Sequence, residues 1–201
     1  GLIWVGSDDG LIHLTKDGGA TWENVTPKKM PDWMMINSID ASSFDSGTAY
    51  IAGTRYKLGD FTPYLYVTDD YGKNWKLITD GIKDEHFTRV LRSDKVNKNI
   101  LYAGTETGMY ISYDRGNSWN EFQKNLPIVP ITDLTIKDNS LIVATQGRSI
   151  WMIDDLTVFH QLTPSTDQMK LYKPKDSYRM GGAGGRKSLT AGTNLPNGAI
   201  I

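Results

Sequence analysis

The 201-residue sequence predicts an all-β protein built from about four repeated units. Three observations lead to this prediction. A short motif ending in tryptophan occurs three times, a stretch of alternating apolar and polar residues precedes each copy, and the chain is rich in the turn-forming residue Gly, with 20 copies. Alternation over four to eight residues, bounded by turn residues, is typical of β-strands.

The repeated motif reads Ser/Thr-x-Asp-x-Gly-x-(Thr/Asn/Ser)-Trp, and its copies begin at Thr15, Thr68 and Ser112. We expect its aspartate to accept hydrogen bonds from backbone N–H groups of its own turn. The glycine supplies a positive φ, and the indole packs between neighbouring sheets. A shared metal site is excluded because the three aspartates lie on different units. The residues in these structural roles are Asp17, Gly19 and Trp22; Asp70, Gly72 and Trp75; and Asp114, Gly116 and Trp119.

The strands around these motifs repeat in a fixed order. The first unit has three expected strands, and each later unit has four. Four-stranded units of about 40–50 residues are typical of β-propeller blades. The expected strands are 2–6, 11–15 and 21–25; then 36–42, 48–54, 64–68 and 75–79; then 87–93, 100–105, 109–113 and 119–123; and finally 131–137, 141–145, 150–154 and 158–162.

We therefore predict that residues 1–162 form propeller blades, one partial and three full. Residues 163–201 should be a linker, Gly-rich at 180–188, and the start of a following domain. The usual minimum for a propeller is about four blades, so we expect further blades or another chain to complete the ring. The chain opens in strand-like sequence and stops within an apolar run, as a fragment would.

The three motifs resemble the Asp-box, or bacterial neuraminidase repeat, of sialidase-like propellers. Residues 1–162 look like the C-terminal part of the propeller in sortilin-type and "glycosyl hydrolase-like" secreted bacterial proteins, and residues 146–156 look like its last blade. The resemblance implies a secreted, periplasmic or cell-surface protein. It specifies fold more than activity, because sialidases, xyloglucanase-type hydrolases, photosystem assembly factors and sortilin receptors all carry the motif.

Composition excludes several classes of function. The formal net charge of −1 gives no basic field for nucleic acid, and no apolar run approaches the ~18 residues of a membrane span. The chain has no cysteine, and its histidines, His13, His86 and His160, have no metal-ligand spacing. We expect neither a metal nor a cofactor.

The turns between second and third strands should lie together on one side of the ring, because equivalent loops of successive blades are neighbours. Their side chains differ from blade to blade, as a ligand-binding surface would require. Solvated turn residues are the alternative interpretation. The candidate binding residues are Asp9, Arg55, Tyr56, Glu106, Gln146 and Arg148.

Two functions remain open at this point. The first is a non-catalytic binding or scaffolding module that recognises polypeptide or glycan. The second is part of a glycoside hydrolase using a pair of carboxylates from the same turns. Sialidase chemistry does not carry over, because a third convergent arginine cannot be placed beside Arg55 and Arg148. Trp33 could stack on a sugar, although packing is the favoured interpretation.

Overall fold

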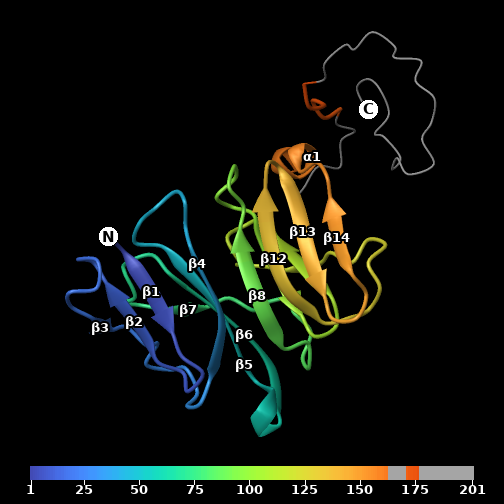
Figure 1. Cartoon of the computed structure of the whole chain (residues 1–201). Helices are drawn as coiled ribbons and strands as arrows, with labels where there is room; N and C mark the ends of the chain where they lie inside the picture. Colours follow the sequence, from blue (N-terminus) through green and yellow to red (C-terminus); the bar gives the residue numbers. More distant parts are fainter. Residues whose placement is uncertain (163–170, 177–201) are drawn as a thin grey trace.

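The computed structural model describes residues 1–162 and 171–176, and its strands form four antiparallel sheets in chain order (Figure 1). We call the sheets blades 1 to 4. Each is a meander in which consecutive strands pair. Blade 1 contains β1 (Ile3–Gly6), β2 (Ile12–Thr15) and β3 (Glu23–Asn24). Blade 2 contains β4 (Met35–Ala41), β5 (Ala49–Arg55), β6 (Asp60–Thr68) and β7 (Lys76–Leu77). Blade 3 contains β8 (Thr88–Ser93), β9 (Leu101–Thr105), β10 (Met109–Ser112) and β11 (Asn120–Glu121), and blade 4 contains β12 (Ile131–Lys137), β13 (Ser140–Thr145) and β14 (Ile150–Ile153).

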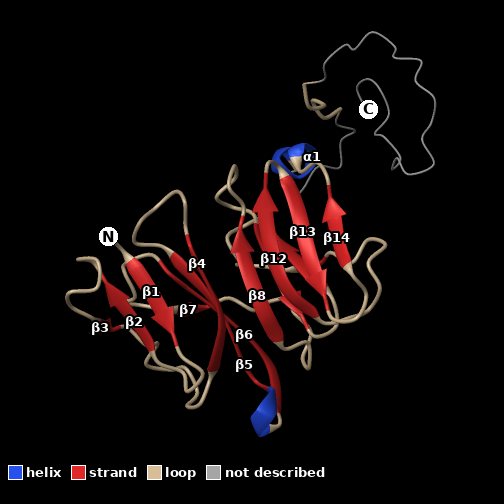
Figure 2. Cartoon of the chain, in the orientation of Figure 1, coloured by secondary structure: helices blue, strands red, loops and turns tan. Residues whose placement is uncertain are grey.

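The prediction of an all-β propeller fragment is confirmed. The described residues contain only two short helical segments, the 3₁₀-helix η1 (Tyr56–Leu58) and the α-helix α1 (Thr157–Gln161) (Figure 2). Three apolar clusters hold the arc together, one between each pair of successive blades. The core is therefore divided among the blade junctions.

The fourth strand expected at 158–162 is wrong, since that segment forms α1. The carboxylate of Asp155 accepts hydrogen bonds from the backbone N–H and the hydroxyl of Thr157, at 2.9 and 2.6 Å, and so starts the helix. Phe159 then packs edge-on against Phe122 of blade 3, with ring centroids 5.3 Å apart. Blade 4 thus has three described strands instead of four. Most of the predicted linker, at 163–170 and 177–201, lies outside the described residues.

Glycines at or near the ends of β1 and β9 let the blades approach closely. A Cβ added to Gly6 would lie 2.5 Å from Ile36, and one added to Gly104 would lie 2.6 Å from Ile131. Both contacts join one blade to the first strand of the next. The apolar run ending in Gly that recurs in the sequence is therefore a blade-packing signal.

The three repeated turns are built as predicted. The carboxylates of Asp17, Asp70 and Asp114 each accept a hydrogen bond, at 2.9 to 3.0 Å, from the backbone N–H four residues later. Each also accepts one from the hydroxyl two residues earlier, at 2.7 to 2.9 Å. The glycines have the expected positive φ, at 105°, 79° and 83° for Gly19, Gly72 and Gly116.

The indoles of these turns pack onto the preceding blade. The Nε1–H of Trp75 donates to the carbonyl oxygen of Val25, and that of Trp119 donates to Ile78, both at 2.7 Å. Trp22 differs, since 44% of its surface is exposed. The expectation that it packs between sheets stays a prediction, because no described blade lies on that side of blade 1.

Candidate ligand-binding surfaces

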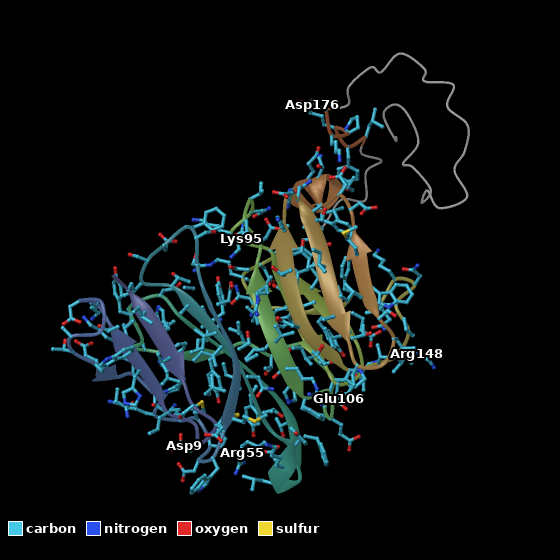
Figure 3. The ribbon with its side chains drawn as sticks, viewed as in Figure 1. Asp9, Arg55, Lys95, Glu106, Arg148 and Asp176 are labelled. Atoms are coloured by element: carbon cyan, nitrogen blue, oxygen red, sulfur yellow. The ribbon has the colours of Figure 1, made fainter. Side chains whose placement is uncertain are left out.

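The turns after β1, β5, β9 and β13 all lie along one edge of the arc. Figure 3 shows Asp9, Arg55, Glu106 and Arg148 spread along this edge, with Lys95 toward the opposite one. We call the edge the rim and define it by the six predicted residues. The repeat geometry thus places the rim as expected. It does not gather the residues into one cluster, since no hydrogen bond or ion pair within the described part of the chain joins two of the six.

Arg55 is held by a carboxylate of its own loop. Its Nη1 donates to Asp60 at 2.7 Å, and the hydroxyl of Tyr64 donates to the same carboxylate at 2.9 Å. Burial alone would raise the pKa of Asp60. Hydrogen bonds from Thr62, Tyr64 and Arg55 outweigh that effect and hold the pKa below its ordinary value. Arg55 is therefore neutralised locally, although its buried Nε–H has no partner in the described residues.

Glu106 is also paired, with an arginine that the sequence analysis missed. The Nε–H of Arg89 donates to the Glu106 carboxylate at 2.6 Å. The same guanidinium lies 5.7 Å from the ring centroid of Tyr56 and 5.4 Å from that of Phe87. Those two rings stack, with centroids 5.3 Å apart. This stack joins the blade 2 loop to blade 3. The sequence indicates this stack only through Arg89 itself, a charged residue among the buried positions of β8.

The remaining rim residues are more open. Arg148 is exposed, its carbonyl accepts the Nε1–H of Trp151 at 2.8 Å, and its guanidinium forms no ion pair within the described part of the chain. Gln146 is exposed, with its backbone N–H bonded to Pro130 at 2.9 Å. Asp9 accepts a hydrogen bond from the Ser7 hydroxyl, and this bond lowers its pKa. Among the described residues, the rim therefore offers one cation without an ion pair, Arg148, and two exposed polar groups.

Trp33 is a surface residue, so the expectation that it packs is wrong. Its side chain is 68% exposed, while its neighbour Met34 is completely buried. A positive φ of 61° at Trp33 turns the indole away from the core. It borders two small cavities of about 200 and 240 Å³, one shared with Arg55 and Tyr56 and the other with Asp9. Exposed tryptophan beside a cavity is a common binding feature.

The carboxyl groups with a clearly shifted pKa differ from the general acid of a glycoside hydrolase. A general acid in glycoside hydrolysis needs a raised pKa. Every carboxyl group of the described residues that has a clearly shifted pKa has it shifted downward. Glu106 of the rim and Asp60 at the start of β6 are each bound to an arginine.

Successive antiparallel meanders packed face to face define this chain as part of a β-propeller. The sequence model of the Sortilin-Vps10 family, described as "Sortilin, neurotensin receptor 3", matches residues 63–179. The chain belongs to the Sortilin-Vps10 family. The comparison with curated proteins finds no match.

Solved propellers share the fold at low sequence identity. A structure titled "YCF48 bound to D1 peptide" is 20% identical with a TM-score of 0.58, and the match covers 76% of this chain and 48% of that one. The GH74 enzyme of Niastella koreensis is 12% identical with a TM-score of 0.58, covering 77% and 26%. The GH74 xyloglucanase of Xanthomonas campestris is 15% identical with a TM-score of 0.54, covering 85% and 29%. The chain thus spans about half or less of each relative, and the likeness concerns the fold alone.

No helix within residues 1–162 and 171–176 is long and apolar enough to cross a membrane.

Proposed function

We propose that this chain is a non-catalytic binding module that recognises a polypeptide on its rim. The observation that carries the proposal is the contrast between paired and open side chains on the rim and directly beside it. The carboxylates of Asp60 and Glu106 are occupied by arginines, whereas Trp33 and Arg148 remain open to a ligand. An exposed indole and a free guanidinium suit an apolar side chain and a carboxylate of a peptide.

The comparison with YCF48 supports polypeptide over glycan, since that propeller was solved with a peptide. Catalysis as part of a glycoside hydrolase is the weaker alternative, because the carboxylates of Asp60 and Glu106 are each bound to an arginine. We also propose that the repeated turns are Asp-boxes and that the chain works outside the cytoplasm, in a secreted bacterial multidomain protein. These last points rest on the motif and on the family resemblance.

Peptide binding through the rim can be tested with an array of random-sequence peptides. We expect Trp33→Ala and Arg148→Ala each to lose most of the peptides that the parent protein retains, while Lys98→Ala, an exposed lysine away from the rim, retains them. Circular dichroism checks that each variant is folded. Retention of the same peptides by both rim variants would count against the proposal, as would hydrolysis of xyloglucan oligosaccharides by the parent.

We further propose that the outer face of blade 1 docks another propeller blade, in the same protein or in another chain. Ile3 and Val5 are exposed there, whereas Tyr50 and Ala52, their equivalents in blade 2, are buried. The 201-residue protein should therefore associate, and Val5→Lys should weaken that association. Sedimentation that gives a compact monomer at high concentration for the parent would contradict this.

A further inference from the structure

The two junctions formed by the repeated turns differ in how the backbone of the motif tryptophan is bonded to the preceding blade. At the junction of blades 2 and 3, the backbone N–H of Trp119 donates to the carbonyl of Asp80 at 2.8 Å, and the indole is 4% exposed. At the junction of blades 1 and 2, the backbone N–H of Trp75 makes no such bond within the described residues. A cavity of about 570 Å³ lies beside it.

An extra residue accounts for the difference. Four residues separate Val25 from Met30, but three separate the equivalent Ile78 and Ile82. Both segments close with the same turn, Met30 N–H to Pro27 and Ile82 N–H to Thr79, each at 3.0 Å. The longer segment thus accompanies both the missing backbone bond at Trp75 and the groove beside it. Because the other junction is closed, the groove is not a necessary consequence of the repeat.

Aromatic side chains and lysines line this groove between blades 1 and 2. The rings of Tyr66, Tyr71 and Trp75 belong to its lining, and Tyr66 is the most buried of the three. The lysines Lys28, Lys29 and Lys73 stand around it, all exposed. We call this feature the junction groove and define it by these six residues.

Tyr66 supplies a hydroxyl without a hydrogen-bond partner among the described residues, in a side chain that is otherwise buried. Its side chain is 6% exposed, and its hydroxyl forms no hydrogen bond within the described residues. Burial raises the pKa of Tyr66 to about 12, so the hydroxyl keeps its proton at neutral pH. The hydroxyl oxygen is not one of the fully buried, unpartnered polar atoms of the described residues, so water or a ligand can reach it. The groove thus offers one donor to an incoming oxygen atom.

The charge around the groove is positive. Glu23, the one acidic residue lining it, pairs with Lys16 at 3.2 Å. Lys28, Lys29 and Lys73 form no ion pair with any described residue. Three uncompensated ammonium groups at one groove favour an anionic ligand.

We propose that the junction groove binds an acidic segment of a polypeptide. Its carboxylates would lie against the three lysines, its apolar side chains would lie on Tyr71 and Trp75, and one oxygen would accept from Tyr66. An extended peptide fits better than an anionic glycan because β3 is the edge strand of blade 1, and an edge strand can pair with added main chain. The site is separate from the rim and needs only blades 1 and 2.

The test uses fluorescence anisotropy with a short labelled peptide of alternating Glu and Leu. Lys28→Glu/Lys29→Glu should weaken binding by about tenfold or more, and added salt should weaken binding to the parent. Tyr66→Phe removes only the hydroxyl and should weaken binding about 3- to 10-fold. The matched control Lys98→Glu/Lys137→Glu makes the same charge change on exposed lysines elsewhere, and should change the affinity by less than about twofold.

The outcomes separate this proposal from the rim proposal. Arg148→Ala should leave the affinity for the Glu-Leu peptide unchanged, because that residue is on the rim. Equal losses in the groove and control variants would overturn the junction groove, as would loss in Arg148→Ala alone. Binding of a heparin oligosaccharide with none of the acidic peptide would assign the lysines to an anionic glycan instead and would also overturn it. Circular dichroism of Tyr66→Phe confirms that a loss is not misfolding.

Discussion

The junction of blades 1 and 2 and the junction of blades 2 and 3 carry the same turn motif but differ in how tightly they close. In both, an indole donates to a carbonyl of the preceding blade and a glycine of the turn faces an apolar residue there. Only the second junction adds the backbone bond between Trp119 and Asp80. The motif therefore aligns the blades, while the segment that follows the fourth strand decides whether the junction is sealed.

The junction of blades 3 and 4 shows that the motif itself can be replaced. Val25, Ile78 and Phe122 each stand three residues after a motif tryptophan. Gly72 covers the first and Gly116 the second, but Phe159 of α1 covers the third. His160 adds a hydrogen bond to the buried carboxylate of Asp94 at 3.0 Å. What the fold requires is a covered apolar residue at this position, and a turn or a helix can provide the cover.

The largest effect that separates the junctions should come from Gly81→Ala. Gly81 has a φ of 90°, and an added Cβ would overlap the carbonyl oxygen of Trp119 in the closed junction. We expect a loss of about 2–5 kcal/mol in the free energy of unfolding, from backbone strain together with overpacking. Urea denaturation measures it.

Gly59→Ala is the matched control. Gly59 has a φ of 74° but no atom within 4 Å of an added Cβ. We expect Gly59→Ala to lower the free energy of unfolding only by the cost of placing a side chain on a left-handed backbone, about 1–2 kcal/mol. Equal losses in the two variants would mean that the closed junction is not sterically tight at Gly81.

Removing the indole N–H should also destabilise the protein more at the closed junction than at the open one. Trp119→Phe leaves the buried carbonyl of Ile78 without its donor and should cost about 2–3 kcal/mol. Trp75→Phe should cost less, about 1 kcal/mol, because the junction groove lets water reach the carbonyl of Val25. Unfolding midpoints of the two variants provide the measurement, and a larger loss for Trp75→Phe would contradict an open groove.

Local parts of this structure could be predicted from the sequence, and parts set by tertiary packing could not. The hydrogen bonds of Asp17, Asp70 and Asp114 join residues two and four positions apart, so the motif itself specifies them. The strands followed from alternation, and the common edge of the rim followed from the repeat. The binding role of the rim residues stays a prediction.

The predictions that failed concern residues whose conformation depends on the surrounding fold and not on the local sequence pattern. The segment 158–162 alternates like a strand, but contacts of Phe159 and His160 with blade 3 make it a helix. Trp33 looked like a core residue, but its positive φ sends Met34 inward in its place. The extra residue between Val25 and Met30 is visible in the sequence, yet its effect depends on the neighbouring blade.

A smaller effect is expected at the turn aspartates. Asp70→Ala removes the acceptor for the backbone and side-chain amides of Asn74, at 2.9 and 2.7 Å, and for the hydroxyl of Thr68 at 2.9 Å. Because water can reach the Asn74 donors, we expect a loss of about 1 kcal/mol. An unchanged midpoint in chemical denaturation would contradict a stabilising role for this carboxylate.

The acid dependence of stability should be the same at both junctions, because each turn aspartate is held by its own turn. The backbone N–H of Asn74 is the main cause that lowers the pKa of Asp70. Burial would raise the pKa of Asp114, but hydrogen bonds from Ser118 and Ser112 outweigh it and lower the pKa. A carboxylate with a folded pKa below its unfolded value of 3.8 stabilises the fold above that pH, and the contribution is lost as the pH falls through the folded pKa.

Denaturation midpoints should thus stay level down to about pH 5 and then fall. Asp70→Asn and Asp114→Asn should each flatten that fall by a similar amount, whereas a clearly larger change for Asp114→Asn would show that the closed junction, and not the turn alone, holds the carboxylate.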